Sequence, residues 1–223
     1  MSKNVNILVV DDHPMTTDAY INLITLSRPD LDFNFEKATD CESAYNHIEV
    51  IHNSNTTLDF AIIDIGLPSF TGQKMTSGTD VAFLIRKKFK NCKILMLTMH
   101  HEAILLSEVF RKINPEGFIS KNDIDFVTFP LIFSSLLNGE KYISKTISEG
   151  LIVLFKKNVN WDEYDNQILL LLGKGIKTKE LPDYIDISLS SIEKRKANIK
   201  LQLLDKKGTD QELIEVAKKL NLI

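Results

Sequence analysis

Residues 60–68 read Phe-Ala-Ile-Ile-Asp-Ile-Gly-Leu-Pro, an apolar run that ends in a carboxylate and then turns. Residues 7–12 repeat the pattern as Ile-Leu-Val-Val-Asp-Asp. Short continuous runs rich in β-branched residues are typical of strands buried on both faces of a parallel sheet. Because an unpaired buried carboxylate is unfavourable, two such strands predict one shared site that contains Asp11, Asp12 and Asp64.

Strands and helices are predicted to alternate along the first 139 residues. Further strands are expected at 31–36, 94–97 and 117–119, and helices at 14–27, 40–52, 81–89, 101–112 and 122–137. Five strands alternating with five helices predict an α/β domain, residues 1–139, with a five-stranded parallel, doubly wound, flavodoxin-like sheet. Ligands of such sheets bind at the carboxyl ends of the strands. Thr98 and Lys121 fall at two more of these ends.

The remainder of the chain is predicted to be helical. Residues 140–160 suggest a linker with one helix, and residues 161–223 a small all-α domain with short helices at 162–172, 178–184, 190–203 and 209–220. The second and third of these helices have the order of a helix-turn-helix, whose second helix enters the major groove of DNA.

A basic segment lies within this helical domain. Although the net charge of the chain is -3, residues 190–207 carry six bases against two acids. The helical period lets Lys194, Arg195, Asn198 and Lys200 point outward, which makes this segment the local candidate for binding a polyanion. The alternative is an ordinary solvated helix face, in which Ser188 or Ser190 caps the helix with Glu193.

Other features limit the class of protein. The apolar run at residues 168–172, like every other in the sequence, is far shorter than the roughly 20 residues of a membrane-spanning helix. The N-terminus has no stretch long enough for a secretory signal. Cys41 and Cys92 are isolated from one another and lack metal-ligand spacing. We therefore expect reduced thiols in a cytoplasmic protein with no membrane partner.

The acidic site favours phosphoryl chemistry. Three converging carboxylates repel one another, and a hard cation such as Mg2+ would keep them ionised while leaving room for phosphate oxygens. Asp64 could then attack a phosphoryl donor as a nucleophile. Lys121 would neutralise one phosphoryl oxygen and the Thr98 hydroxyl would bond another. Each residue alone is more simply a loop, packing or surface residue, or a helix cap in the case of Asp12; their conjunction carries the prediction.

Residues 5–138 resemble the receiver domains of two-component response regulators. The resemblance is carried by Val9-Val10-Asp11-Asp12-His13-Pro14, Ile62-Ile63-Asp64-Ile65-Gly66-Leu67-Pro68, Leu97-Thr98 and Gly117-Phe118-Ile119-Ser120-Lys121. It implies that Asp64 accepts phosphate from a sensor histidine kinase and that Phe118 is the aromatic switch residue. It also implies that Asp12, Asp64 and the Gly66 carbonyl ligate Mg2+, with Asp11 acting through water.

Two features depart from that family. The segment from Pro68 to Gly78 is several residues longer than usual, which is a reason to expect unusual partner choice or phosphoryl lifetime. Met99 stands where a small residue is common, and it would narrow access to the phosphoryl group.

Residues 161–221 are similar to the helix-turn-helix of the LuxR/NarL class. The matching pattern is Ile168-Leu169-x-Leu171-Leu172-Gly173-x-Gly175, Lys179-Glu180-Leu181, Ile185-x-Ile187-Ser188, Ser191-Ile192-Glu193-x-Arg195 and Asn198-Ile199. The resemblance implies that the residues meeting DNA are Lys179, Ser191, Lys194, Arg195, Lys196 and Asn198. Glu193, Arg195 and Pro182 depart from the common residues at their positions.

We therefore expect a phosphorylation-regulated DNA-binding transcription factor, not an enzyme, that is a homodimer when phosphorylated or bound to DNA. One alternative is a phosphohydrolase, which would lack a second acid because Gly66 stands two residues after Asp64. The other is a protein-interaction module whose helical domain does not bind DNA specifically, as Glu193 and the balanced charge of residues 162–223 would allow.

Overall fold

The computed structural model describes residues 4–157, 161–204 and 207–223, and it divides into two compact units. The first consists of Met1–His100 and Val109–Ile147, and the second of His101–Glu108 and Ser148–Ile223. The helices α4 (Ala103–Ile113) and α6 (Lys145–Lys157) contribute residues to both. None of the described helices is long and apolar enough to cross a membrane.

The first unit is built on a parallel sheet with the strand order β2-β1-β3-β4-β5-β6. The strands are β1 (Asn4–Val10), β2 (Asp32–Ala38), β3 (Phe60–Asp64), β4 (Lys93–Thr98), β5 (Gly117–Ser120) and β6 (Tyr142–Ile143). This confirms the doubly wound parallel sheet. The five-stranded count was wrong, because Tyr142 and Ile143, in the segment expected to be linker, pair with Gly117 and Phe118 as a sixth strand.

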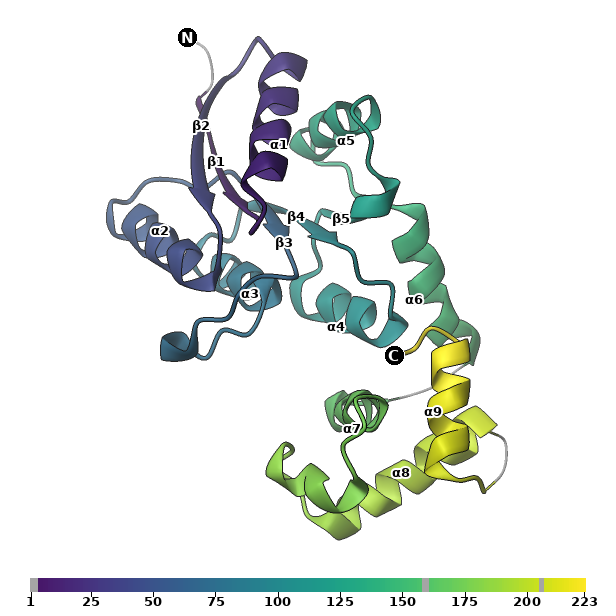
Figure 1. Ribbon diagram of the computed structural model, residues 1–223. Coiled ribbons are helices and arrows are strands. Elements are labelled where there is room, and N and C mark those ends of the chain that lie inside the picture. The colour runs from purple at the N-terminus through teal and green to yellow at the C-terminus, as the bar shows by residue number, and fades with distance from the viewer. Residues whose placement is uncertain (1–3, 158–160, 205–206) are drawn as a thin grey trace. The chain divides into compact units, whose positions relative to one another are not determined.

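Helices cover both faces of the sheet (Figure 1). The helices α1 (Pro14–Ser27) and α5 (Thr128–Leu137) pack together over the face that carries Ile62, Leu97 and Ile119. The helices α2 (Cys41–Asn53) and α3 (Gly78–Lys88) contact each other on the opposite side. Because side chains alternate between the faces of a strand, both faces of β3 are apolar, and all five of its residues are buried.

The start of α5 differs from the expectation. Residues Lys121–Asp123 form a 3-10 turn, η2, and α5 begins only at Thr128. The Asp125 carboxylate accepts hydrogen bonds from the backbone N–H groups of Val127 and Thr128, so it caps the helix there. The predicted helix start at residue 122 was therefore wrong, because α5 begins six residues later. At α2 the N-cap is Asp40, whose side chain accepts a hydrogen bond from the Ser43 N–H.

The long connection after β3 is an ordered hairpin. Phe70 and Met75 form an isolated antiparallel bridge around the 3-10 turn η1 (Thr71–Gln73), and the Phe70 ring lies 5.8 Å from that of Tyr45 in α2. At its base, Cys41 N–H donates to the Pro68 carbonyl at 3.1 Å. The extra residues therefore pack on α2 and are not an irregular loop throughout.

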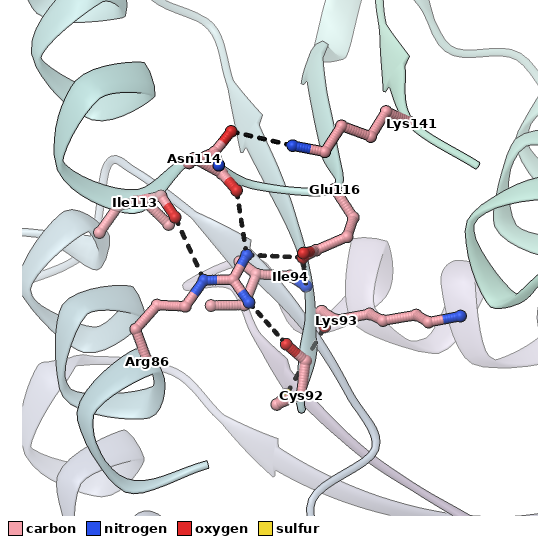
Figure 2. A network of polar contacts seen from close by, with 8 residues as sticks. All are labelled: Arg86, Cys92, Lys93, Ile94, Ile113, Asn114, Glu116 and Lys141. Carbon is pink, nitrogen blue, oxygen red and sulfur yellow. Dashed lines mark hydrogen bonds and ion pairs between the residues drawn. The ribbon is translucent and has the colours of Figure 1, made fainter. Parts of the chain in front are cut away.

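An arginine joins three elements at the end of the sheet opposite the acids. Arg86, in the last turn of α3, donates to the carbonyls of Cys92, Ile113 and Asn114 and to the Glu116 carboxylate at 2.6 Å (Figure 2). Glu116 in turn accepts from the N–H of Ile94 at 2.8 Å. This network fixes the chain ends that lead into β4 and β5.

The second unit is helical around one apolar core. Its elements include α7 (Glu163–Gly173), the 3-10 helix η3 (Thr178–Asp183), α8 (Leu189–Leu204) and α9 (Asp210–Lys219). Leu169, Leu181, Ile192 and Leu213 meet in the core. The α-helix expected at 178–184 is a 3-10 helix that contains Pro182, whose ring would clash with the carbonyl of Thr178 in an α-helix. Thr209 and Glu212 form a capping box at the start of α9.

Candidate functional site

Polar residues gather at the carboxyl end of the sheet. Asp11 follows β1, Asp64 and Thr98 are the last residues of β3 and β4, and Lys121 follows β5. In register, Asp64 pairs with Leu97 and Thr98 pairs with Ser120, so these strand ends lie at one edge. Parallel strands buried on both faces deliver these polar groups to one place although they are far apart in sequence.

Lys121 joins the two buried acids. Its ammonium nitrogen lies 2.8 Å from Asp11 Oδ2 and 2.9 Å from Asp64 Oδ2. Asp11 and Asp64 are 1% and 6% exposed, so their charges would be unfavourable without this cation. The sequence predicted that these three residues share one site, and in the structure Lys121 contacts both acids.

The contacts also set the charge of Lys121. Burial by itself would lower the pKa of its ammonium, but the hydrogen bonds to Asp11 and Asp64 outweigh burial and raise it. Lys121 is therefore a fixed positive charge at ordinary pH. On the neighbouring α1, burial raises the pKa of the Tyr20 phenol, and the charges of Asp11 and Asp64 raise it further.

The acid pair offers ligands for a cation. Carboxylate oxygens of Asp11 and Asp12 and a ring nitrogen of His13 lie within 4.8 Å of one another. Asp12 Oδ1 is buried and accepts no hydrogen bond from the described residues, although His13 Nδ1 lies 2.6 Å from it. Two adjacent carboxylates, one of which accepts no hydrogen bond from the described residues, fit a hard divalent ion such as Mg2+. His13, which ends the acidic stretch, was not among the predicted site residues.

The helix-cap alternative for Asp12 is not what the structure shows. The N-cap of α1 is His13, with no side-chain cap, and Pro14 opens the helix. It is Asp11 that turns the backbone, since its Oδ1 accepts from the His13 N–H at 3.0 Å. The Asp12 carboxylate therefore takes no part in capping α1.

The remaining predicted site residues occupy different environments. Thr98 is fully buried, and its hydroxyl accepts a hydrogen bond from the His100 N–H at 2.8 Å. Phe118 is fully buried within β5, and Met99 is exposed. Gly66 lies in the turn after Asp64 and is exposed. The Thr98 hydroxyl hydrogen is still available to an acceptor at the strand ends.

A glycine supports the Asp64 backbone from α3. A Cβ added at Gly78 would lie 1.8 Å from the Asp64 carbonyl oxygen. The Gly78 N–H donates a hydrogen bond to the Ile65 carbonyl oxygen at 3.0 Å. No other residue type fits this approach without a backbone shift. The long hairpin therefore ends at Gly78, which packs against the backbone of Asp64.

In the second unit, the bases of α8 differ in their surroundings. Arg195 bonds Asp162 and Asp165, and Lys196 and Lys200 both contact Asp210. Ser191, Lys194 and Asn198 on α8 and Lys179 on η3 are exposed. The predicted outward orientation thus describes Lys194 and Asn198 better than Arg195 and Lys200. No pattern in the sequence indicates these ion pairs, whose partners lie 10 to 33 residues away.

A family comparison matches this geometry. A model of the response regulator receiver domain matches residues 7–128. The chain belongs to this family. The match covers all the strand ends described above and agrees with the predicted receiver resemblance.

Full-length relatives and solved structures extend the comparison. The oxygen regulatory protein NreC of Staphylococcus carnosus is 26% identical over 231 residues, covering 98% of this chain and 99% of NreC. RcsB from Salmonella enterica serovar Typhimurium, solved with promoter P1flhDC and BeF3-, has a TM-score of 0.65 at 19% identity, covering 96% and 98% of the two chains. A LuxR-family response regulator from Aurantimonas sp. SI85-9A1 has a TM-score of 0.53 at 23% identity and covers 67% and 96%. The prediction of a two-component response regulator of the LuxR/NarL class is confirmed.

Proposed function

We propose that this chain is a phosphorylation-regulated transcription regulator, in which Asp64 accepts a phosphoryl group and the unit that contains α8 binds DNA. The contact of Lys121 with both Asp11 and Asp64 carries the first half of the proposal. It places a fixed cation beside a buried carboxylate, where it can neutralise a phosphoryl group that becomes attached to Asp64.

Phosphoryl transfer makes one bond and breaks another. An Asp64 carboxylate oxygen attacks phosphorus, and the bond from phosphorus to the donor atom breaks with the electron pair leaving on the donor. For a phosphohistidine of a sensor kinase, the leaving group is an imidazole, which takes up a proton. The product on this chain is an acyl phosphate at Asp64.

The surrounding side chains stabilise the transferred group. Lys121 shifts its contact from the Asp64 carboxylate to a phosphoryl oxygen, and Thr98 donates its free hydroxyl hydrogen to another. Asp11 and Asp12, with Asp64 and the Gly66 carbonyl, would hold Mg2+, which supplies charge neutralisation when bound.

The DNA half of the proposal rests on two observations. The second unit presents a helix, α8, with exposed Ser191, Lys194 and Asn198, and exposed Lys179 lies on the preceding η3. RcsB, whose fold this chain shares, has been solved as two dimers bound to two parallel DNAs, with a TM-score of 0.62 at 19% identity. We assign the same kind of partner to this chain, together with a homodimeric DNA-bound state.

The receiver half is tested with the full chain, Mg2+ and acetyl phosphate. We expect mass spectrometry to find one hydroxylamine-sensitive phosphoryl group on Asp64, and none on the Asp64→Asn variant. Asp18→Asn, which removes an exposed acid that pairs with Lys37, is the matched control and should label normally. Equal labelling of Asp64→Asn and wild type would overturn the assignment.

The DNA half is tested by selection from a random duplex library, with and without acetyl phosphate. Enrichment of one sequence, stronger with the donor, supports transcription regulation. The competing candidate, a receiver-type protein-interaction module, is favoured by the exposed Glu193 and by the internal pairing of most α8 bases. A selection that enriches no sequence in either condition would support that candidate instead. The phosphohydrolase alternative lost its support when the chain proved to belong to the receiver family.

A further inference from the structure

The four bases of α8 fall into two groups. Arg195, Lys196 and Lys200 form ion pairs with acids of the same unit. Lys194 forms none with any residue that the structure describes, and it is exposed. The groups therefore differ in whether the charge is available to an external polyanion.

Arg195 connects α8 to the beginning of α7. One guanidinium nitrogen lies 2.8 Å from Asp162 and 2.9 Å from Asp165, and the group also lies 5.3 Å from the centroid of the Tyr164 ring. Asp162 and Asp165 together form the capping box of α7, so they are held in place by the helix end itself. The hydrogen bonds that Arg195 donates to Asp165 and Asp162 raise the pKa of its guanidinium group. The arginine thus binds the rigid first turn of another helix.

Lys196 and Lys200 connect α8 to the beginning of α9. Both lie one turn apart on α8, and their ammonium nitrogens are 2.9 Å and 2.6 Å from Asp210, the first residue of α9. Lys196 also donates to the Thr178 hydroxyl of η3 at 2.8 Å. Both lysine side chains are only 15% exposed. Three elements meet at this cluster, which fixes the position of α8 against η3 and α9.

What remains outward on α8 is a nearly neutral stripe. Lys194, Ala197, Asn198 and Leu201 are exposed at spacings of three or four residues, which places them on one side of the helix, and Glu193 lies beside them. The exposed Glu193 offsets the charge of Lys194. A DNA contact through this stripe would involve few phosphates and would depend weakly on salt.

We propose that Arg195, Lys196 and Lys200 are positioning residues that hold α8 against α7, η3 and α9, and that Lys194 and Asn198 supply its direct contacts to DNA. The second part of this inference rests on the proposed DNA binding. The first part does not, because it concerns only the packing of the unit. The two parts therefore need separate measurements.

A double-mutant cycle on the full chain tests positioning. The variants are Lys196→Gln, Asp210→Asn and the two together, and urea unfolding is followed by the fluorescence of Trp161, the one tryptophan in the sequence. Trp161 is buried in the core of the second unit, so it reports on that unit. We expect Lys196→Gln to lower the unfolding midpoint in wild type and much less when Asp210 is already Asn, because the two residues interact directly.

Lys194 provides the matched control for the cycle. Lys194→Gln should shift the midpoint little, and equally with or without Asp210→Asn, because it has no described ion pair. A Lys196 effect that is the same in both backgrounds would overturn the positioning role.

Salt dependence of DNA binding tests the contacts. The probe is the duplex enriched by selection, or a mixed-sequence duplex if none is enriched. Each variant is measured under conditions in which the fluorescence of Trp161 shows that the second unit is folded. Lys194→Gln should reduce the slope of log affinity against log salt by about 0.9, the loss of one phosphate contact, or should abolish preference for the enriched duplex. Lys196→Gln should leave the slope unchanged.

The outcomes separate the two ideas. The wild-type chain could bind DNA while Lys196→Gln, and not Lys194→Gln, reduces the slope of log affinity against log salt. That result would overturn the inference and leave the proposed function standing. A wild-type chain with no salt-dependent binding overturns the proposed function and the contact assignment together. In that case the double-mutant cycle still decides the positioning role.

Discussion

Asp123 binds Thr146 twice: its two carboxylate oxygens accept from the Thr146 N–H and from the Thr146 hydroxyl, each at 2.9 Å. Asp123 ends the 3-10 turn that Lys121 begins, and Thr146 lies in the first turn of α6. The start of α6 is thereby tied to the turn that follows the carboxyl end of β5. Ser120 and Ser144 add a parallel link, from the Ser120 N–H to the Ser144 hydroxyl at 3.1 Å.

Asp123→Ala should lower the free energy of unfolding by about 1 kcal/mol, the usual effect of losing a capping carboxylate. Burial would raise the pKa of Asp123, but hydrogen bonds from Ser144 and Thr146 outweigh it and lower that pKa below its ordinary 3.8. The stabilisation is therefore present above pH 3.8 and is lost as the pH falls through the lower folded-state pKa. Urea unfolding of the wild type and of Asp123→Ala, measured from neutral pH down to acid pH, should show the difference in their free energies of unfolding shrinking in acid. A difference that grows in acid would contradict the assignment.

Gly78→Ala should destabilise the first unit by about 3 kcal/mol, because its Cβ would overlap the Asp64 carbonyl and force the backbone apart. The extent of phosphoryl labelling of Asp64 should also fall in the Gly78→Ala variant. Gln73→Ala is the control, because this residue lies exposed at the tip of the same hairpin, away from Asp64. Thermal unfolding and labelling are measured on both, and equal behaviour of the two variants would refute the close approach.

Arg86→Met should lower the free energy of unfolding by about 3 kcal/mol, since it removes the cation beside the Glu116 carboxylate and the hydrogen bonds that Arg86 donates to three carbonyls. The neighbouring exposed Lys87→Met should change it by less than about 0.5 kcal/mol. Chemical denaturation monitored by circular dichroism compares the two. A small effect of Arg86→Met would show that the network in Figure 2 contributes little.

Mg2+ should stabilise the wild-type chain and act less on Asp12→Asn, which loses a buried carboxylate oxygen that accepts no hydrogen bond from the described residues. At a concentration a hundredfold above the dissociation constant, bound ion adds about 2.7 kcal/mol to the free energy of unfolding. The measurement is the melting temperature with Mg2+ and after chelation by EDTA. The Asp18→Asn variant should respond like wild type, and an identical Mg2+ response of Asp12→Asn would remove that carboxylate from the ligand set.

The sequence predicted the part of the site that depends on strand ends. Apolar runs ending at Asp11, Asp64 and Thr98 could be recognised locally, and parallel topology then brings them together. The strand formed by Tyr142 and Ile143 could not, because two residues show no periodicity and only the edge of β5 selects them. The start of α5 could not be predicted either, because Asp123 and Asp125 are both possible caps in the sequence. In the structure Asp125 bonds the first N–H of α5, whereas Asp123 bonds the start of α6.

The α8 bases show a different limit. Helical spacing indicates which side chains share a face, but not which acids from distant parts of the chain approach that face. Arg195 finds Asp162 and Asp165 only once α7 and α8 have packed. Charge counts along the sequence therefore overstate the positive charge that such a helix offers to a partner.

The hairpin from Pro68 to Gly78 has a practical consequence. Both of its ends are fixed, by the Cys41 to Pro68 hydrogen bond and by Gly78 against Ile65, while Phe70 and Met75 close it below the tip. Residues 71–74 at the tip are all exposed. A fluorophore or a short epitope inserted there would sit outside the closed base, which makes this tip the place to attach a reporter of phosphorylation while leaving the backbone around Asp64 intact.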